Sequence, residues 1–289
     1  MTNWTEVIGK AVQLVSGYNN QGIRPTLRQI HYRLASEQVG GYVNTQACYK
    51  VLSQKLVSAR MNGILSWDAI ADHVRYRWWF KLRPFEEFNP YAILENKIEN
   101  YGRDPWGITN KQVLIWLEKD ALAELVLDSV GDLYVPLCIS RGYSSWTFIY
   151  ENKDLLNPNT KVLYLGDHDP SGLDIERFTQ EAMEHFGLDF SFKRLALTYG
   201  QVQEYGLLPN PTKKADPRAG EYIGRYGDEC WELDALEPRI LQAIVRGVVE
   251  AEIDESLLAE VERENQKRRQ EILEKLKRRL GRSGTANRS

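Results

Sequence analysis

Residues 161–172 read KVLYLGDHDPSG, and this stretch decides the fold. Its apolar run at 162–165 predicts a buried strand, and the proline and glycine that follow predict the start of a helix over 172–185. Asp167 and Asp169 lie two residues apart in the extended connection, so their side chains should point to the same side. The stretch therefore predicts a strand, a loop with paired carboxylates and a helix.

The same alternation of apolar run and helix continues on both sides of this stretch. Further apolar runs are found at 113–117, 134–139 and 190–197, and helical patterns at 120–129, 144–152 and 201–205. Short apolar runs separated by helices are typical of a parallel sheet with both faces covered. We predict an α/β domain over residues 111–250, with a loop-rich part at 207–235. In such folds the site lies at the carboxyl ends of the strands.

Residues 1–85 have a different pattern and read as mostly helical. Helices are expected over 4–16, 27–37 and 45–62, and the residues 64–67 predict a short strand. Three short helices with tight turns, followed by a strand-like piece and basic residues, favour a winged helix-turn-helix. We therefore interpret this part as a DNA-binding winged-helix (CAP-like) domain.

Two further segments lie outside these domains. Residues 76–110 are aromatic and irregular, and we interpret 86–110 as a connecting region whose aromatic side chains are explained better by packing than by base stacking. Residues 251–289 are predicted to form a long charged helix over 255–280 and a tail. The basic side chains of this helix could bind DNA or could simply be solvated.

The composition excludes several classes of protein. With 43% hydrophobic and 27% charged residues among 289, the chain is not disordered, collagen-like or a coiled-coil rod. The three cysteines form no CxxC motif, which excludes a disulfide framework and a zinc knuckle and fits a reducing cytosol. No apolar run approaches the roughly 18 residues that span a bilayer, and no signal-peptide core is present. We expect a cytoplasmic protein without a membrane partner.

The net charge of −3 hides an uneven distribution of charge. Residues 1–85 carry 11 basic against 4 acidic side chains, residues 86–262 carry 16 against 33, and residues 263–289 carry 10 against 3. Basic ends favour a polyanionic partner, while the acidic middle repels phosphate unless a cation is bound there. A solvated acidic surface would give the same count, so charge alone leaves both interpretations open.

The acids that end two predicted strands are the candidate metal ligands. Glu118 follows the run 113–117, and Asp167 and Asp169 follow 162–165. If these strands are neighbours, three carboxylates converge, and a set of oxygen ligands favours Mg²⁺, or Mn²⁺, over zinc. Each acid also has a simpler interpretation, since Asp169 could be a helix N-cap and Glu118 could pair with Lys119. His168, between the two aspartates, should point away from them and either be structural or support the metal ligands from behind.

Tyr32 is the candidate nucleophile. Leu27, Ile30, His31 and Leu34 follow the spacing of a helix face that packs on a core, so Tyr32 is expected on the opposite, exposed side. Arg28 lies one turn before it and could bind a phosphate and help the phenol to ionise. A tyrosine at a domain interface is the simpler interpretation, and the residues alone favour it.

Three segments of the chain resemble a Toprim domain. They are LIWLEKDAL around Glu118, CISRGYSS with its glycine-tyrosine turn at Gly142, and YLGDHDPSGLDI with a DxDPxG element. They are most similar to the type IIB topoisomerase (topoisomerase VI) A subunits and the related meiotic double-strand-break transesterases. Residues 232–236 (ELDAL) resemble a late ELxAL segment of that family. The resemblance covers roughly residues 20–245.

The resemblance implies a catalytic site. In that family a glutamate and two aspartates hold Mg²⁺ beside the scissile phosphate, which implies this role for Glu118, Asp167 and Asp169. The catalytic tyrosine follows an Arg-x-Ile-Tyr-Tyr motif, which matches Arg28 to Tyr32, except that His31 stands where the family usually has another tyrosine.

The implied function is Mg²⁺-dependent cleavage of duplex DNA through a phosphotyrosyl link. The implied partners are double-stranded DNA in the nucleoid, a second copy of the chain and a separate ATPase subunit, since the sequence contains no ATPase signature of its own. Two alternatives stay open at this point. One is a Toprim nuclease that uses water as its nucleophile, and the other is a non-catalytic DNA-binding subunit of a larger complex.

Overall fold

The computed structural model describes residues 2–71, 90–99, 101–187 and 189–283. They form two compact units. The first contains the described parts of 1–75 and 112–249, and the second contains those of 76–111 and 250–289.

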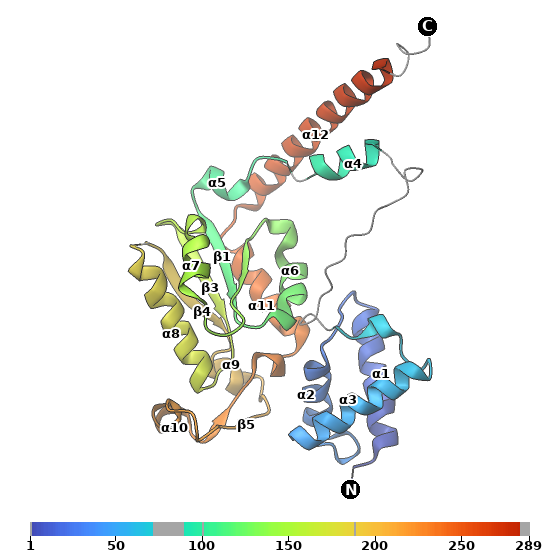
Figure 1. The fold of residues 1–289 in the computed structure, drawn as a ribbon, viewed down its shortest axis with the longest axis vertical. Coiled ribbons are helices and arrows are strands. Elements are labelled where there is room, and N and C mark those ends of the chain that lie inside the picture. Colours follow the sequence, from blue (N-terminus) through green and yellow to red (C-terminus); the bar gives the residue numbers. More distant parts are fainter. Residues whose placement is uncertain (1, 72–89, 100, 188, 284–289) are drawn as a thin grey trace. The chain divides into compact units, whose positions relative to one another are not determined.

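A parallel sheet forms the centre of the first unit (Figure 1). Its four strands lie in the order β2-β1-β3-β4, with bounds β1 Gln112–Leu117, β2 Leu137–Ile139, β3 Thr160–Leu165 and β4 Ser191–Ala196. The predicted parallel sheet is confirmed. β1 and β3 are direct neighbours, and Leu117 pairs with Leu165 at their carboxyl ends. The residues that follow these two strands therefore start at the same edge of the sheet.

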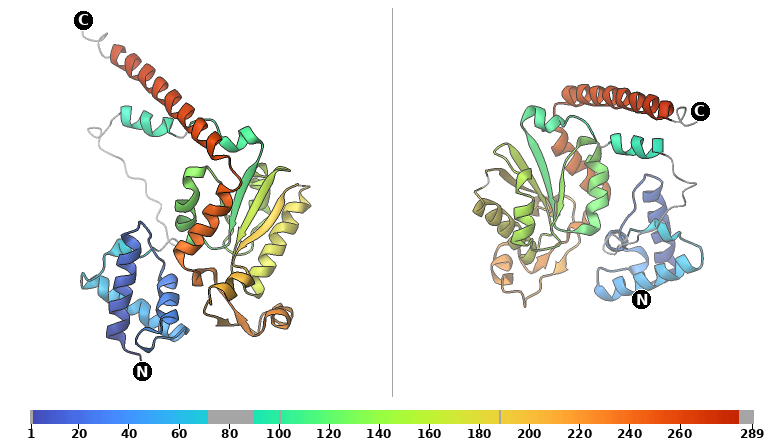
Figure 2. Two further views of the ribbon diagram at one scale, coloured as in Figure 1. Left: turned by 180° about the vertical axis from the view of Figure 1, so that it is seen from behind. Right: turned by 45° about the horizontal axis from the view of Figure 1, so that its top comes forward.

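Helices cover both faces of this sheet. They are α6 (Ala123–Val130), α7 (Trp146–Glu151), α8 (Pro170–His185) and α11 (Pro238–Glu250). Two shorter helices, α9 (Tyr199–Glu204) and α10 (Ala219–Tyr226), follow β4 in the chain and lie beyond the carboxyl ends of the strands (Figure 1). Alternate side chains of β1 and β3, such as Trp116 and Tyr164, pack with Ile149 of α7 and Met183 of α8. Figure 2 shows α6 and α11 on the opposite face.

The segment 207–235 contains more regular structure than the loops predicted for it. It includes α10 and a short antiparallel pair, β5 (Asn210–Pro211) and β6 (Glu229–Cys230). Gly220 and Gly224 lie inside α10, and glycine is a poor helix former, so the sequence does not indicate this short helix.

Three helices precede the sheet, as predicted: α1 (Trp4–Asn19), α2 (Leu27–Ser36) and α3 (Gln46–Met61). Thr26 and Thr45 cap α2 and α3 with their side chains, which fixes where these helices begin. The apolar faces of the helices meet in one core that includes Val15, Ile30 and Leu56. This helical segment belongs to the same compact unit as the sheet.

The strand predicted at 64–67 is wrong. Gly63 adopts a positive φ of 70° and turns the chain, and the Ser66 side chain accepts from the Asp68 N–H at the start of a 3₁₀ turn. Within residues 2–71, the extended pairing that the structure shows is an isolated bridge between Thr26 and Ala71. The rest of the predicted wing, residues 72–85, lies outside the described residues.

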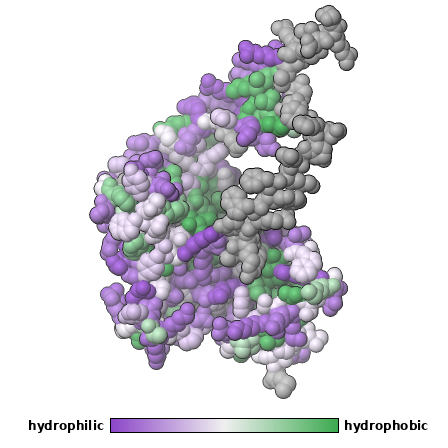
Figure 3. Space-filling model, viewed as in Figure 1, coloured by the Kyte–Doolittle hydropathy of each residue, from purple (hydrophilic) through white to green (hydrophobic). Residues whose placement is uncertain are grey.

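The second unit consists of helices. Its elements are α4 (Pro90–Ile98), α5 (Pro105–Thr109) and α12 (Glu255–Ser283). Asn265 of α12 is buried and forms hydrogen bonds with the backbone N–H and C=O of Arg103, at 2.8 and 3.0 Å. Figure 3 shows apolar residues gathered where α4 packs on α12, while most of α12 is polar.

The predicted long charged helix is therefore confirmed. The connecting region expected to be irregular contains α4 and α5, and the aromatic residues expected to pack at 76–88 lie outside the described residues. In the part of the chain that the structure describes, no helix is both long and apolar enough to cross a bilayer.

Candidate functional site

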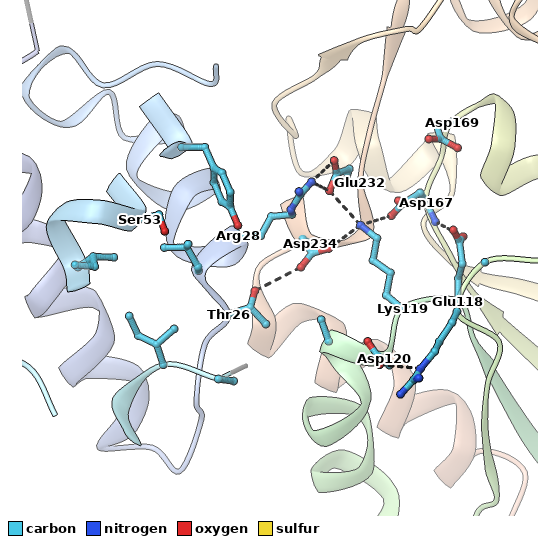
Figure 4. Close-up of a pocket in the computed structure, with 18 of the residues that line it drawn as sticks. Thr26, Arg28, Ser53, Glu118, Lys119, Asp120, Asp167, Asp169, Glu232 and Asp234 are labelled. Carbon is cyan, nitrogen blue, oxygen red and sulfur yellow. Dashed lines mark hydrogen bonds and ion pairs between the residues drawn. The ribbon is translucent and has the colours of Figure 1, made fainter. Parts of the chain in front are cut away.

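A cavity of about 960 Å³ lies in the first unit, between the helical segment and the carboxyl edge of the sheet. Its charged lining contains six acids and five basic residues: Glu118, Asp120, Asp167, Asp169, Glu232 and Asp234, with Arg28, Arg60, Lys119, Arg141 and Lys213. The three predicted carboxylates and the predicted phosphate-binding arginine therefore share one cavity. Figure 4 shows the side chains that face each other across it.

The three carboxylates reach this cavity because β1 and β3 end side by side. Glu118 accepts a hydrogen bond from the Asp167 backbone N–H at 3.2 Å, which ties the two loops together. Asp167 accepts from the Leu233 N–H at 2.7 Å, and Asp169 accepts from the Gly172 N–H at 2.6 Å as the N-cap of α8. The N-cap interpretation of Asp169 is thus confirmed, although the same side chain also lines the cavity.

The loop between β3 and α8 is held in shape by Arg194 and Gly172. The guanidinium of Arg194 donates to the carbonyl oxygens of Gly166, Asp167, Leu197 and Gly172 at 3.0 to 3.2 Å. A Cβ at position 172 would lie within 3.0 Å of the Asp167 carbonyl, so glycine allows the loop to close tightly onto the helix. These contacts fix where the aspartates stand.

Burial disfavours the charged forms of Glu118 and Asp167. It raises the pKa of Glu118, and it raises the pKa of Asp167 to about 7 in spite of the opposing effect of Lys119. Buried acids of this kind are stabilised by a proton or a cation. The donor set therefore fits a hard divalent ion, which prefers carboxylate oxygens.

The carboxylates do not form a ready ligand cage as they stand. Among the described residues, no three His, Cys, Asp or Glu side chains are placed to hold one metal ion. Lys119 Nζ stands among the acids instead, and it contacts Asp167 at 2.9 Å, Glu232 at 3.1 Å and Asp234 at 2.7 Å (Figure 4).

Lys119 was expected to pair with its neighbour Glu118, and this alternative is wrong. Consecutive residues of an extended segment point to opposite sides, so Lys119 is directed toward the segment 232–234. Burial acts to lower the pKa of Lys119, but its three carboxylate partners raise it well above its ordinary value. The side chain is a permanent cation within the cavity.

Arg28 also binds the segment 232–234. Its guanidinium forms an ion pair with Glu232 and lies over the Tyr49 ring, 5.4 Å from the centroid. Burial acts to raise the pKa of Glu232, but Lys119 and Arg28 together lower it. Arg28 therefore faces the cavity as predicted, but an internal carboxylate holds it.

The prediction that Tyr32 is exposed is wrong. Only 4% of its surface is accessible, and its hydroxyl accepts a hydrogen bond from Asn210 Nδ2 at 2.6 Å. α2 is covered on both sides, because the 3₁₀ turn Leu233–Ala235 packs on the side that looked free in the sequence. Tyr32 does not belong to the residues that line the cavity.

Arg28 acts to lower the pKa of Tyr32, which is the direction that was predicted. Burial and the Glu232 carboxylate raise the pKa of Tyr32, and the opposing effects of Asn210, Arg28 and Lys119 do not compensate. The phenol is therefore held in its neutral form.

The two histidines of interest are structural, as predicted. His31 is buried in the core face of α2, with its ring nitrogens 2.7 Å from the Tyr42 hydroxyl and 2.9 Å from Asn44 Oδ1. His168 points away from the aspartates on each side of it and contacts the Tyr222 hydroxyl at 2.9 Å. Burial lowers the pKa of His168 to about 4, so it is neutral near pH 7.

Sequence reasoning missed the roles of four residues: Lys119, Arg194, Glu232 and Asp234. The last two share the i, i+2 spacing of Asp167 and Asp169, but Asp234 lies in the 3₁₀ turn Leu233–Ala235, so the alternation of an extended strand does not apply to them. They also follow no strand of the main sheet, so the pattern of strand ends did not indicate them.

No protein-family model matches the chain, and no curated protein is similar enough to count as a relative.

Proposed function

We propose that this chain is a Toprim-like enzyme that cleaves the phosphodiester backbone of double-stranded DNA and depends on a divalent cation. One observation carries the proposal: the carboxylates that follow β1 and β3 line the same cavity as Arg28, Arg60 and Arg141. Carboxylates suit a hard cation, and arginines suit phosphate oxygens, so this cavity combines the two groups that phosphodiester cleavage requires.

Glu118, Asp167 and Asp169 are the residues that would hold Mg²⁺ or Mn²⁺. When bound, such an ion supplies positive charge beside the phosphate that reacts. Arg28 and Arg60 from the helical segment, with Arg141 from the loop after β2, orient the phosphate between both walls of the cavity. In this proposal the helical segment is the DNA-binding domain.

Two nucleophiles are compatible with this site. The resemblance to type IIB topoisomerase A subunits favours Tyr32, which would form a phosphotyrosyl link in a homodimer, with the tyrosine of one protomer acting at the carboxylates of its partner. A separate ATPase partner and a place in the nucleoid belong to the same proposal. This route requires α2 to move away from Asn210, because the Tyr32 hydroxyl is buried and hydrogen-bonded.

The burial of Tyr32 favours a second candidate, a hydrolytic nuclease. In that reaction water attacks the phosphate, and Tyr32 only packs α2 against the segment around Asn210. The products differ, because transesterification leaves protein attached to the DNA and hydrolysis leaves free ends.

The test is to incubate the full-length chain with duplex DNA and Mg²⁺ or Mn²⁺, denature the mixture and separate free DNA from DNA linked to protein. An adduct that is lost in Tyr32→Phe supports the transesterase, and free ends that persist in Tyr32→Phe support the nuclease. Tyr101→Phe is the matched control, since 72% of Tyr101 is exposed. Binding of DNA without either product would refute the proposed cleavage.

A further inference from the structure

The acidic cavity already contains a cation of its own. Lys119 Nζ lies between Asp167 on one side and Glu232 and Asp234 on the other, at 2.7 to 3.1 Å from each (Figure 4). The ammonium donates hydrogen bonds to Glu232 and Asp234, and its contact with Asp167 is an ion pair. Asp234 is only 3% exposed, so this is an interior arrangement and not a surface ion pair.

Lys119 already pairs with Asp167 Oδ1, an oxygen atom that a metal ion at this site would need as a ligand. Asp167 Oδ1 accepts a hydrogen bond from the Leu233 N–H and forms an ion pair with Lys119 Nζ, so two positively polarised groups already contact that oxygen. A divalent cation at Asp167 would stand close to the ammonium, and two cations at one carboxylate repel each other. Binding of the ion at Asp167 is therefore in competition with Lys119.

Glu232 and Asp234 are alternative ion-pair partners for the Lys119 ammonium. Both contact Lys119 already, so Lys119 can release Asp167 and keep two carboxylate partners without moving far. Resting on the proposed metal-dependent function, we propose that Lys119 is an internal counter-cation that holds Asp167 in the cation-free protein and moves wholly onto Glu232 and Asp234 when a divalent cation binds.

Arg28 connects this exchange to the substrate. Glu232 binds Arg28 and Lys119 at the same time. A phosphate that takes Arg28 away from Glu232 leaves that carboxylate free for Lys119, which in turn releases Asp167. Phosphate and divalent cation then favour each other's binding, and this coupling is reciprocal.

The test measures the affinity of the full-length chain for Mn²⁺ without DNA, by isothermal titration calorimetry. Lys119→Met removes the competing cation and should lower the Kd at least about tenfold, or about 1.4 kcal/mol. Asp234→Asn removes one of the two carboxylates onto which Lys119 moves, so it should raise the Kd for Mn²⁺. The matched controls are Lys214→Met and Asp228→Asn, which alter an exposed ion pair of 3.8 Å and should leave the Kd unchanged.

Opposite effects of the two variants are the signature of the exchange, since a general loss of structure would weaken binding in both. If Mn²⁺ binds equally to the wild type, Lys119→Met and Asp234→Asn, the role of Lys119 is refuted while the metal site stands. If neither the wild type nor Lys119→Met binds Mn²⁺, the metal site itself is refuted. Should Lys119→Met fail to fold, Lys119→Gln takes its place: tighter binding of Mn²⁺ than in the wild type supports the exchange, and equal or weaker binding overturns it.

Discussion

Replacing Tyr32 by phenylalanine should destabilise the protein by about 1–2 kcal/mol, because the hydroxyl is the acceptor for a half-buried donor. The lost contact is the 2.6 Å hydrogen bond from Asn210 Nδ2 to the Tyr32 hydroxyl. The side-chain oxygen of Asn210, Oδ1, accepts a second hydrogen bond from Asn44 Nδ2 at 3.2 Å. The amide cannot turn to find another acceptor without breaking that second bond. For a compact unit as large as the first one, this loss of stability corresponds to a fall in Tm of about 2–6 °C.

The assay is urea denaturation followed by circular dichroism, with the free energy of unfolding compared at an unchanged m value. Tyr101→Phe removes a hydroxyl from an exposed ring and should stay within about 0.5 kcal/mol of the wild type. A double-mutant cycle with Asn210→Ala should give a coupling energy above about 0.5 kcal/mol.

A Tyr32→Phe variant as stable as the wild type, with no coupling to Asn210, would refute the buried position of Tyr32. The tyrosine would then stand free on α2, as the sequence pattern alone predicts, and the argument for a hydrolytic reaction would lose its basis.

Three further predictions concern the loop between β3 and α8. Because burial raises the pKa of Asp167 to about 7, an incoming cation must displace a proton below that pH. The affinity for Mn²⁺ should therefore rise up to about tenfold per pH unit below 7 and level off above it, and a flat titration profile would contradict this. Asp169→Asn preserves the N-cap of α8 and should keep its stability, whereas Asp169→Ala should lose about 1 kcal/mol in thermal denaturation; equal melting of the two would speak against the cap. Gly172→Ala places a Cβ within 3.0 Å of the Asp167 carbonyl. It should cost about 2 kcal/mol or more, and a variant with unchanged unfolding in urea would show that the loop closes differently.

The sheet and the edge that carries the carboxylates could be predicted from the sequence, because each depends on a local pattern. A parallel strand buried on both faces is a short apolar run, and the run at 162–165 lies within β3. Glu118 and Asp167 follow two such runs, and the carboxyl ends of parallel strands meet at one edge, so their proximity needed only the pairing of β1 with β3.

The surroundings of Tyr32 and Lys119 could not be predicted in this way. Tyr32 depends on Asn210 and on the turn Leu233–Ala235, and Lys119 depends on Glu232 and Asp234. Each of these partners lies more than a hundred residues further along the chain than the residue it contacts. The periodicity of α2 shows which side faces its own core, but it carries no information about a second partner that covers the other side. The sequence led us to expect a metal ion as the positive charge beside the carboxylates. In the structure the Lys119 ammonium lies beside Asp167.

The measurement that tests the central proposal most directly is cleavage of duplex plasmid DNA by the full-length chain, in the presence of Mn²⁺ or of a chelator. Asp169→Asn is the decisive variant, because it keeps the N-cap of α8 and removes one carboxylate from the cavity, and Asp228→Asn is its surface control. We predict cleavage by the wild type and by Asp228→Asn with Mn²⁺, and none with the chelator or with Asp169→Asn. Cleavage that continues in Asp169→Asn, or in the chelator, would contradict the assignment of these carboxylates to a metal-dependent site.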